Sequence, residues 1–113
     1  MNEKQAAALG RTEAVFREVN ERIAEAAVRF DADDVDLVCE CADPSCVHRL
    51  EASVAEYERV RGDGATFLLA EGHHDPRIES LVATEDGVAV VRKTDPAARA
   101  VVEALDPRQR PKG

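Results

Sequence analysis

The sequence has few aromatic side chains. Its 113 residues include no tryptophan, one tyrosine and three phenylalanines, so aromatic residues make up only 4% of the chain. A chain of this length usually forms one domain, but here few large side chains are available to fill its core. A bound metal ion can supplement a thin apolar core. We therefore predict a single small zinc-binding domain over residues 1–113, with residues 1–10 as a flexible leader and residues 106–113 as a flexible tail.

The chain also has fewer positive than negative charges. The chain has 15 lysines and arginines against 23 aspartates and glutamates, which gives a formal net charge of −8 at pH 7. A negative field of this size repels phosphate backbones and anionic lipid headgroups. The charge therefore disfavours general nucleic-acid binding and membrane binding, and it favours a protein partner that carries basic side chains.

The sequence lacks long apolar runs. No segment approaches the length needed to span a membrane, and residues 1–10 lack the apolar segment of a secretory signal. We therefore expect a cytoplasmic protein whose thiols stay reduced. The cysteine count of three is odd, which also argues against a disulfide framework.

The apolar pattern predicts an α+β fold that begins with an amphipathic helix. Its apolar side chains recur at spacings of three and four, and we expect the resulting stripe to pack on the rest of the domain. A stripe that binds a partner instead is the less favoured alternative. Thr12 is the expected N-cap of this helix. The apolar positions are Val15, Phe16, Val19, Ile23, Ala26, Ala27 and Phe30.

The later part of the chain predicts a small, mostly antiparallel sheet and two more helices. Ser53 and Glu56 form a capping box at the start of a short second helix, and Asp95 is the expected N-cap of a last helix. Asp86-Gly87, between two apolar runs, indicates a hairpin near the C-terminus. The predicted strands are residues 35–39, 66–70, 80–84 and 88–93, and the predicted later helices are residues 54–61 and 96–105.

All three cysteines fall within residues 39–48. Zinc binds four ligands in a tetrahedron, usually thiolate sulfur or imidazole nitrogen. One residue separates Cys39 from Cys41 and four separate Cys41 from Cys46, and Pro44 restricts the loop between the last two. Three ordinary buried thiols are the alternative, because cysteine behaves as a small hydrophobic residue. The polar, turn-like loop argues against that alternative and favours zinc or a similar metal with a preference for soft ligands.

The fourth ligand would have to be a histidine. His73 is the first choice, because the preceding Gly72 allows the backbone to approach closely. His48 is the second choice and His74 is a further candidate. A site with four protein ligands is typical of structural zinc, whereas catalytic zinc keeps a position for water. The predicted ligands are Cys39, Cys41, Cys46 and His73.

Four segments together resemble a family of small actinobacterial proteins, most of which have no known activity. The shared segments are F-R-x-x-N-E-R-I at residues 16–23, C-E-C-x4-C at residues 39–46, E-Y-x-x-V-R at residues 56–61 and G-H at residues 72–73. The resemblance covers about residues 14–93. It implies that the three cysteines and His73 are shared positions, and it implies no particular activity.

The favoured function is a structural-zinc module for protein interaction or regulation. A redox or metal sensor that releases zinc when its thiolates oxidise is the alternative. A metal-dependent hydrolase is less favoured, because the sequence contains no phosphate-binding glycine loop, no H-E-x-x-H motif and no nucleophile elbow. We predict no catalytic residue, and we interpret Glu40 and Asp43 as parts of a solvated acidic loop.

Overall fold

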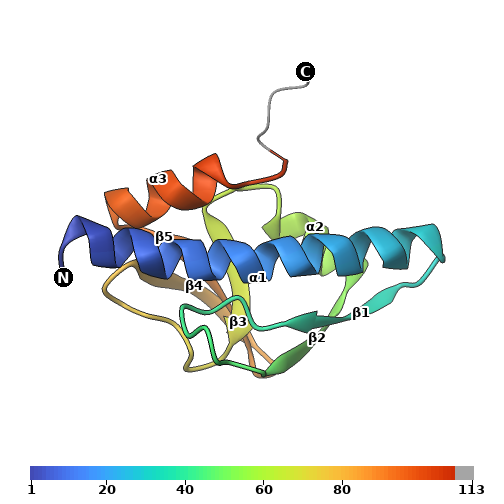
Figure 1. Ribbon diagram of the computed structural model, residues 1–113. Helices are drawn as coiled ribbons and strands as arrows, with labels where there is room; N and C mark the ends of the chain where they lie inside the picture. Colours follow the sequence, from blue (N-terminus) through green and yellow to red (C-terminus); the bar gives the residue numbers. More distant parts are fainter. Residues whose placement is uncertain (109–113) are drawn as a thin grey trace, which may run out of the picture.

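The computed structural model describes residues 1–108, which contain three helices and two small antiparallel sheets (Figure 1). The predicted α+β fold class is confirmed. No helix in this part of the chain has the length and apolar character needed to cross a membrane. The helices are α1 (Glu3–Arg29), α2 (Val54–Val60) and α3 (Pro96–Ala104). The two-stranded sheet contains β1 (Asp34–Val38) and β2 (Arg49–Ser53), and the three-stranded sheet, in the order β3-β5-β4, contains β3 (Thr66–Ala70), β4 (Glu79–Glu85) and β5 (Val88–Lys93).

Helix α1 starts much earlier than predicted. Asn2 is its N-cap, and its side chain accepts a hydrogen bond from the Gln5 backbone while the Gln5 side chain accepts one from the Asn2 backbone. This capping box satisfies amide groups that the first turn leaves without intrahelical partners. The predictions of a flexible leader over residues 1–10 and of an N-cap at Thr12 are therefore wrong. An alanine-rich start has no apolar periodicity, so the sequence pattern did not reveal it.

The N-terminal half of α1 packs against α3, which lies alongside it in Figure 1. Ala6 and Gly10 are buried there, together with Ala98 of α3. A Cβ atom at Gly10 would lie 3.0 Å from the carbonyl oxygen of Ala98. The absence of a side chain at Gly10 thus sets how closely the two helices approach.

The buried face of α1 combines small residues with charged and polar ones, and it matches the predicted apolar stripe only in part. Ile23 and Ala27 of that stripe pack against the core, as predicted, whereas Val15, Val19 and Phe30 are exposed, which contradicts the prediction. Burying charged side chains is costly unless each finds a partner, and distant parts of the chain supply those partners here. The buried positions of α1 are Ala6, Gly10, Glu13, Ala14, Arg17, Asn20, Glu21 and Ala24.

One buried charge cluster joins α1 to the three-stranded sheet. The Lys93 ammonium lies 2.8 Å from a carboxyl oxygen of Glu13 and also pairs with Glu79, and all three side chains are fully buried. Lys93 and Arg17 both lie over the ring of Phe67, at 4.1 and 4.4 Å from its centre. Arg17 donates hydrogen bonds of 2.6 Å to the carbonyls of two further segments, at residues 64 and 102. These contacts offset the cost of burying the charges.

A second charge cluster fixes the chain after α3. The Arg61 guanidinium pairs with Glu21 of α1 and with Asp106, and all three side chains are buried. Arg108 pairs with Glu21 as well. The predicted flexible tail is therefore wrong for residues 106–108, and residues 109–113 lie outside the described part of the chain.

Local sequence signals correctly predicted several elements. The capping box of Ser53 and Glu56 begins α2, and the Asp95 side chain accepts from the backbone at the start of α3. Asp86 and Gly87 both have positive φ, as expected for the tight turn between β4 and β5. Strand β2 was not predicted; its Leu50 pairs with Leu37 of β1.

Candidate metal centre

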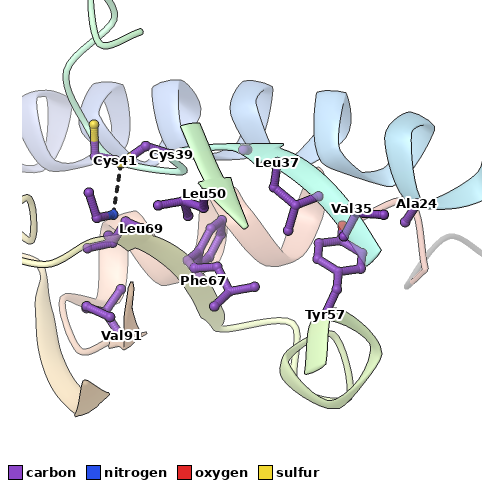
Figure 2. Packing of buried hydrophobic residues seen from close by; sticks show 14 of the residues in the cluster. Ala24, Val35, Leu37, Cys39, Cys41, Leu50, Tyr57, Phe67, Leu69 and Val91 are labelled. Atoms are coloured by element: carbon purple, nitrogen blue, oxygen red, sulfur yellow. Dashed lines mark hydrogen bonds between the residues drawn. The ribbon is translucent and has the colours of Figure 1, made fainter. Parts of the chain in front are cut away.

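The cysteine segment begins where β1 leaves its partner strand. The Cys39 amide still donates to the carbonyl of His48, whereas the next amide, that of Glu40, donates to the carbonyl of Leu68 in β3 at 2.9 Å. The chain therefore crosses from the two-stranded sheet to the edge of β3. This crossing brings the first two cysteines to the end of β3, where Figure 2 shows Cys39 and Cys41 at the border of the apolar core beside Leu69.

Glu40 holds this crossing in place. Its buried carboxylate accepts one hydrogen bond from the Leu68 amide at 3.0 Å and another from the Asn20 side chain at 2.7 Å. The Asn20 side chain also donates a hydrogen bond to the carbonyl of Val38 and accepts one from the Val38 amide. These bonds attach α1 to the end of β1. The interpretation of Glu40 as part of a solvated loop is wrong, whereas Asp43 is exposed as expected. Burial raises the pKa of the Glu40 carboxyl, although its hydrogen bonds oppose that shift.

Three cysteines and one histidine converge at this place. One potential ligand atom from each of Cys39, Cys41, Cys46 and His73 lies within 4.8 Å of all the others. The Nδ1 atom of His73 is 3.6 Å from Cys39 Sγ and 3.7 Å from Cys46 Sγ. With Zn–S bonds of about 2.3 Å and Zn–N bonds of about 2.0–2.1 Å, a tetrahedron places sulfur and nitrogen ligands ~3.6 Å apart. The observed spacing is therefore compatible with a metal ion between the four groups.

A tight turn after β3 presents His73. The His73 amide donates to the carbonyl of Ala70 at 3.0 Å, and Gly72 in between has φ of +86°. Glycine is favoured there because other residues adopt this conformation at a cost. A Cβ atom at Gly72 would meet nothing within 4 Å, so its conformation, not the expected close approach, explains the glycine.

The four groups differ in their access to solvent. Cys39 and Cys41 are buried, Cys46 is half-buried and His73 is exposed. The Ala70 amide donates to Cys39 Sγ at 3.2 Å, an interaction that favours a thiolate. Burial raises the pKa of the Cys39 and Cys41 thiols, and the nearby Cys46 thiol adds to the shift of both. A bound cation would reverse it, because a coordinating thiol is deprotonated.

The other two histidines lie outside the cluster. The ring of His48 packs edge-on against that of His73, with 5.1 Å between ring centres, and His48 is exposed. His74 is half-buried, and its Nδ1 atom has no hydrogen-bond partner among the described residues. The structure thus brings together the four side chains predicted as ligands and leaves both alternative histidines beside them.

Comparisons of the chain with family models, with curated proteins and with solved structures found no match.

Proposed function

We propose that the protein is a structural-zinc module for protein interaction or regulation, and that it works in the cytoplasm. The proposed ligands are Cys39 Sγ, Cys41 Sγ, Cys46 Sγ and His73 Nδ1. The observation that carries the proposal is the spacing of 3.6 and 3.7 Å between the imidazole nitrogen and two of the sulfurs. Thiolate and imidazole ligands together suit zinc, whereas magnesium and calcium prefer oxygen.

A structural role is favoured because protein side chains would fill the whole tetrahedron. The ion would join the loop at residues 39–46 to the turn at residues 71–74, and most residues of these two segments are exposed or half-buried. Closing such a link stabilises the folded chain, since zinc binding and folding are coupled in small domains. A catalytic zinc would need a coordination position open to water.

The histidines offer a matched test of the ligand set. His73→Ala should lower the zinc content of the purified protein from one ion per chain and should destabilise the fold. His48→Ala removes a neighbouring exposed imidazole of the same size, and it should leave the zinc content unchanged. Equal zinc loss in both variants, or in neither, would contradict the proposed assignment.

A redox sensor is the second candidate, and the exposure of the site supports it. Cys46 is only half-buried, so a small oxidant such as hydrogen peroxide can reach its sulfur. Two zinc-bound thiolates would be oxidised to one disulfide, the peroxide would be reduced to water with uptake of two protons, and zinc would leave. A sensor should release zinc at micromolar peroxide and regain it after treatment with a reductant. If the thiolates do not react under these conditions, the sensor function is excluded and the structural role remains.

The resemblance to actinobacterial proteins remains a proposal as well. It is supported by where the shared segments lie: Asn20 anchors the end of β1, Glu21 pairs with Arg61, and Tyr57 fills the core beside them. Each segment thus contributes either to the cysteine cluster or to the buried contacts that support it.

A further inference from the structure

A line of apolar side chains on α1 faces away from the rest of the protein. Val15, Val19 and Phe30, the C-cap residue of α1, are 60%, 42% and 77% exposed. Ala26 and Ile23, which are half-buried, complete the line, and Ile23 also packs against the core at its inner edge. We call these five residues the α1 seam. Figure 1 shows that α1 runs across the full width of the molecule at its surface. A helix of a globular protein normally turns its apolar stripe toward the core, so an exposed stripe marks an interaction surface.

We propose that the α1 seam binds a second copy of this chain, with the two α1 helices antiparallel across a two-fold axis. The proposal concerns the outer face of α1 and is independent of the proposed metal ligands. Two properties of the helix point to a second copy as the partner: the order of charges beside the seam and the spacing of the apolar side chains within it.

A row of charges with alternating sign flanks one side of the seam. Its members are Glu18, Arg22, Glu25 and Arg29, and all are wholly or partly exposed. Within one chain, Arg22 already pairs with Glu18 at 2.7 Å and with Glu25 at 3.0 Å. The row therefore reads negative, positive, negative, positive toward the C-terminus.

An antiparallel two-fold axis sets this row against its own copy in reverse order. In one register, Glu18 lies opposite Arg29 of the second copy and Arg22 lies opposite Glu25 of the second copy. The symmetry repeats both pairs, so every charge in the row meets an opposite charge. In a parallel pair, the two rows would lie on opposite sides of the interface and could not pair with each other. Such flanking charges contribute little affinity when exposed, but they set the orientation of paired helices.

The same register interleaves the apolar side chains. When positions 18 and 29 face each other, position n of one helix faces position 47 − n of the other. Phe30 of the second copy then falls level with position 17, between Val15 and Val19. Ala26 of the second copy falls level with position 21, between Val19 and Ile23. The side chains of each helix thus enter the gaps of the other, as ridges enter grooves in helix packing.

The size of the seam sets the expected strength of the contact. Residues 15–30 span about 24 Å of helix at 1.5 Å per residue. One helix pair of this length buries less than the roughly 800 Å² per partner of a standard stable complex. We therefore expect a dimer that dissociates in the micromolar range.

Sedimentation of the full chain between about 5 and 500 µM tests the proposal across that range. The expected result is a monomer–dimer equilibrium. Val15→Glu and Phe30→Ser should each raise the dissociation constant about tenfold or more, because each removes an apolar anchor from the interface. The far-ultraviolet circular dichroism and the metal content should stay unchanged in both variants. Val82→Glu, at a position of β4 that is 57% exposed, is the matched control and should not change the equilibrium.

A charge exchange tests the antiparallel register. One variant carries Glu18→Arg and Glu25→Arg, and the other carries Arg22→Glu and Arg29→Glu. Each row then has one sign, so each variant alone should associate more weakly than the original chain, and an equimolar mixture should form a heterodimer.

Three results would overturn the proposal. A monomer at all concentrations would exclude a second copy as the partner of the seam. A dimer that Val15→Glu and Phe30→Ser leave intact would place the interface elsewhere. Equal self-association of the charge variants, with no preference for the mixture, would exclude the antiparallel register. Metal analysis of the same samples keeps these outcomes separate from the test of the zinc site.

Discussion

The buried Lys93 at the end of β5 should contribute strongly to the stability of the fold. In Lys93→Met, the carboxyl groups of Glu13 and Glu79 lose the cation that both contact inside the protein. Removing one partner of a buried ion pair typically costs about 3–5 kcal/mol. The free energy of unfolding of such a domain is roughly 5–15 kcal/mol, so the substitution should remove a large fraction of the stability. Urea denaturation measures this loss as a shift in midpoint, and Lys4→Met, at an exposed position, is the matched control.

A neutral version of the cluster separates lost charge pairing from lost packing. Glu13→Gln, Glu79→Gln and Lys93→Met combined in one chain leave no charge buried without a partner. This triple variant should recover most of the stability that Lys93→Met loses, because replacing a whole buried ionic cluster is often neutral or stabilising. A single Lys93→Met variant that unfolds at the midpoint of the original protein would refute the reasoning.

The same cluster predicts how stability depends on pH. Burial raises the pKa of Glu13 from 4.5 to about 9, although Lys93 opposes the shift. The folded state then keeps a proton on Glu13 that the unfolded state releases above about pH 4.5. The contribution of this proton to the free energy of unfolding is therefore fully present below that pH. It is lost as the pH rises toward 9, at a rate of at most about 1.4 kcal/mol per pH unit. Glu13→Gln should flatten this decline between pH 5 and 9, and an unchanged profile would contradict the assignment.

Three further predictions concern the cysteine cluster. Glu40→Ala leaves the buried Leu68 amide without its hydrogen-bond acceptor. It should therefore lower the free energy of unfolding in urea by about 1–3 kcal/mol, and it should weaken zinc binding about 10–100-fold in a chelator competition. Unchanged values would show that Glu40 does not support the site. Gly72→Ala places a side chain at φ of +86° and should cost about 1 kcal/mol in thermal unfolding. An unchanged melting temperature would contradict that cost. In the zinc-loaded protein, Cys46 should react with a thiol reagent faster than Cys39 because it is more exposed, and equal rates measured by peptide mapping would contradict the described burial.

The elements that the sequence predicted well depend on neighbouring residues. The capping box of Ser53 and Glu56 and the Asp86-Gly87 turn each act over four residues or fewer, so no distant contact could overrule them. The four side chains of the cysteine cluster were also predictable, because three lie within eight residues and few histidines compete for the last place.

The packing of α1 was not predictable from its own pattern. Its apolar stripe has the period of a core-facing helix, yet the buried face carries Glu13, Arg17 and Asn20. Each of these has partners far away in the chain, such as Lys93 for Glu13 and the end of β1 for Asn20. Periodicity reports where apolar residues lie on a helix, but not which face finds charged partners in the folded chain. Glu40 was misinterpreted for the same reason, since its acceptor role depends on β3.

The most direct test of the central claim is the absorption spectrum of the cobalt-substituted protein after its metal content has been measured. We expect one zinc ion per purified chain. For the cobalt form, we expect strong thiolate charge-transfer bands and tetrahedral ligand-field bands that added anions do not shift. Bands that shift with anions would reveal an open coordination position and would contradict a site closed by three cysteines and His73. A purified chain without metal that also fails to bind cobalt would show that the cysteines are ordinary buried thiols.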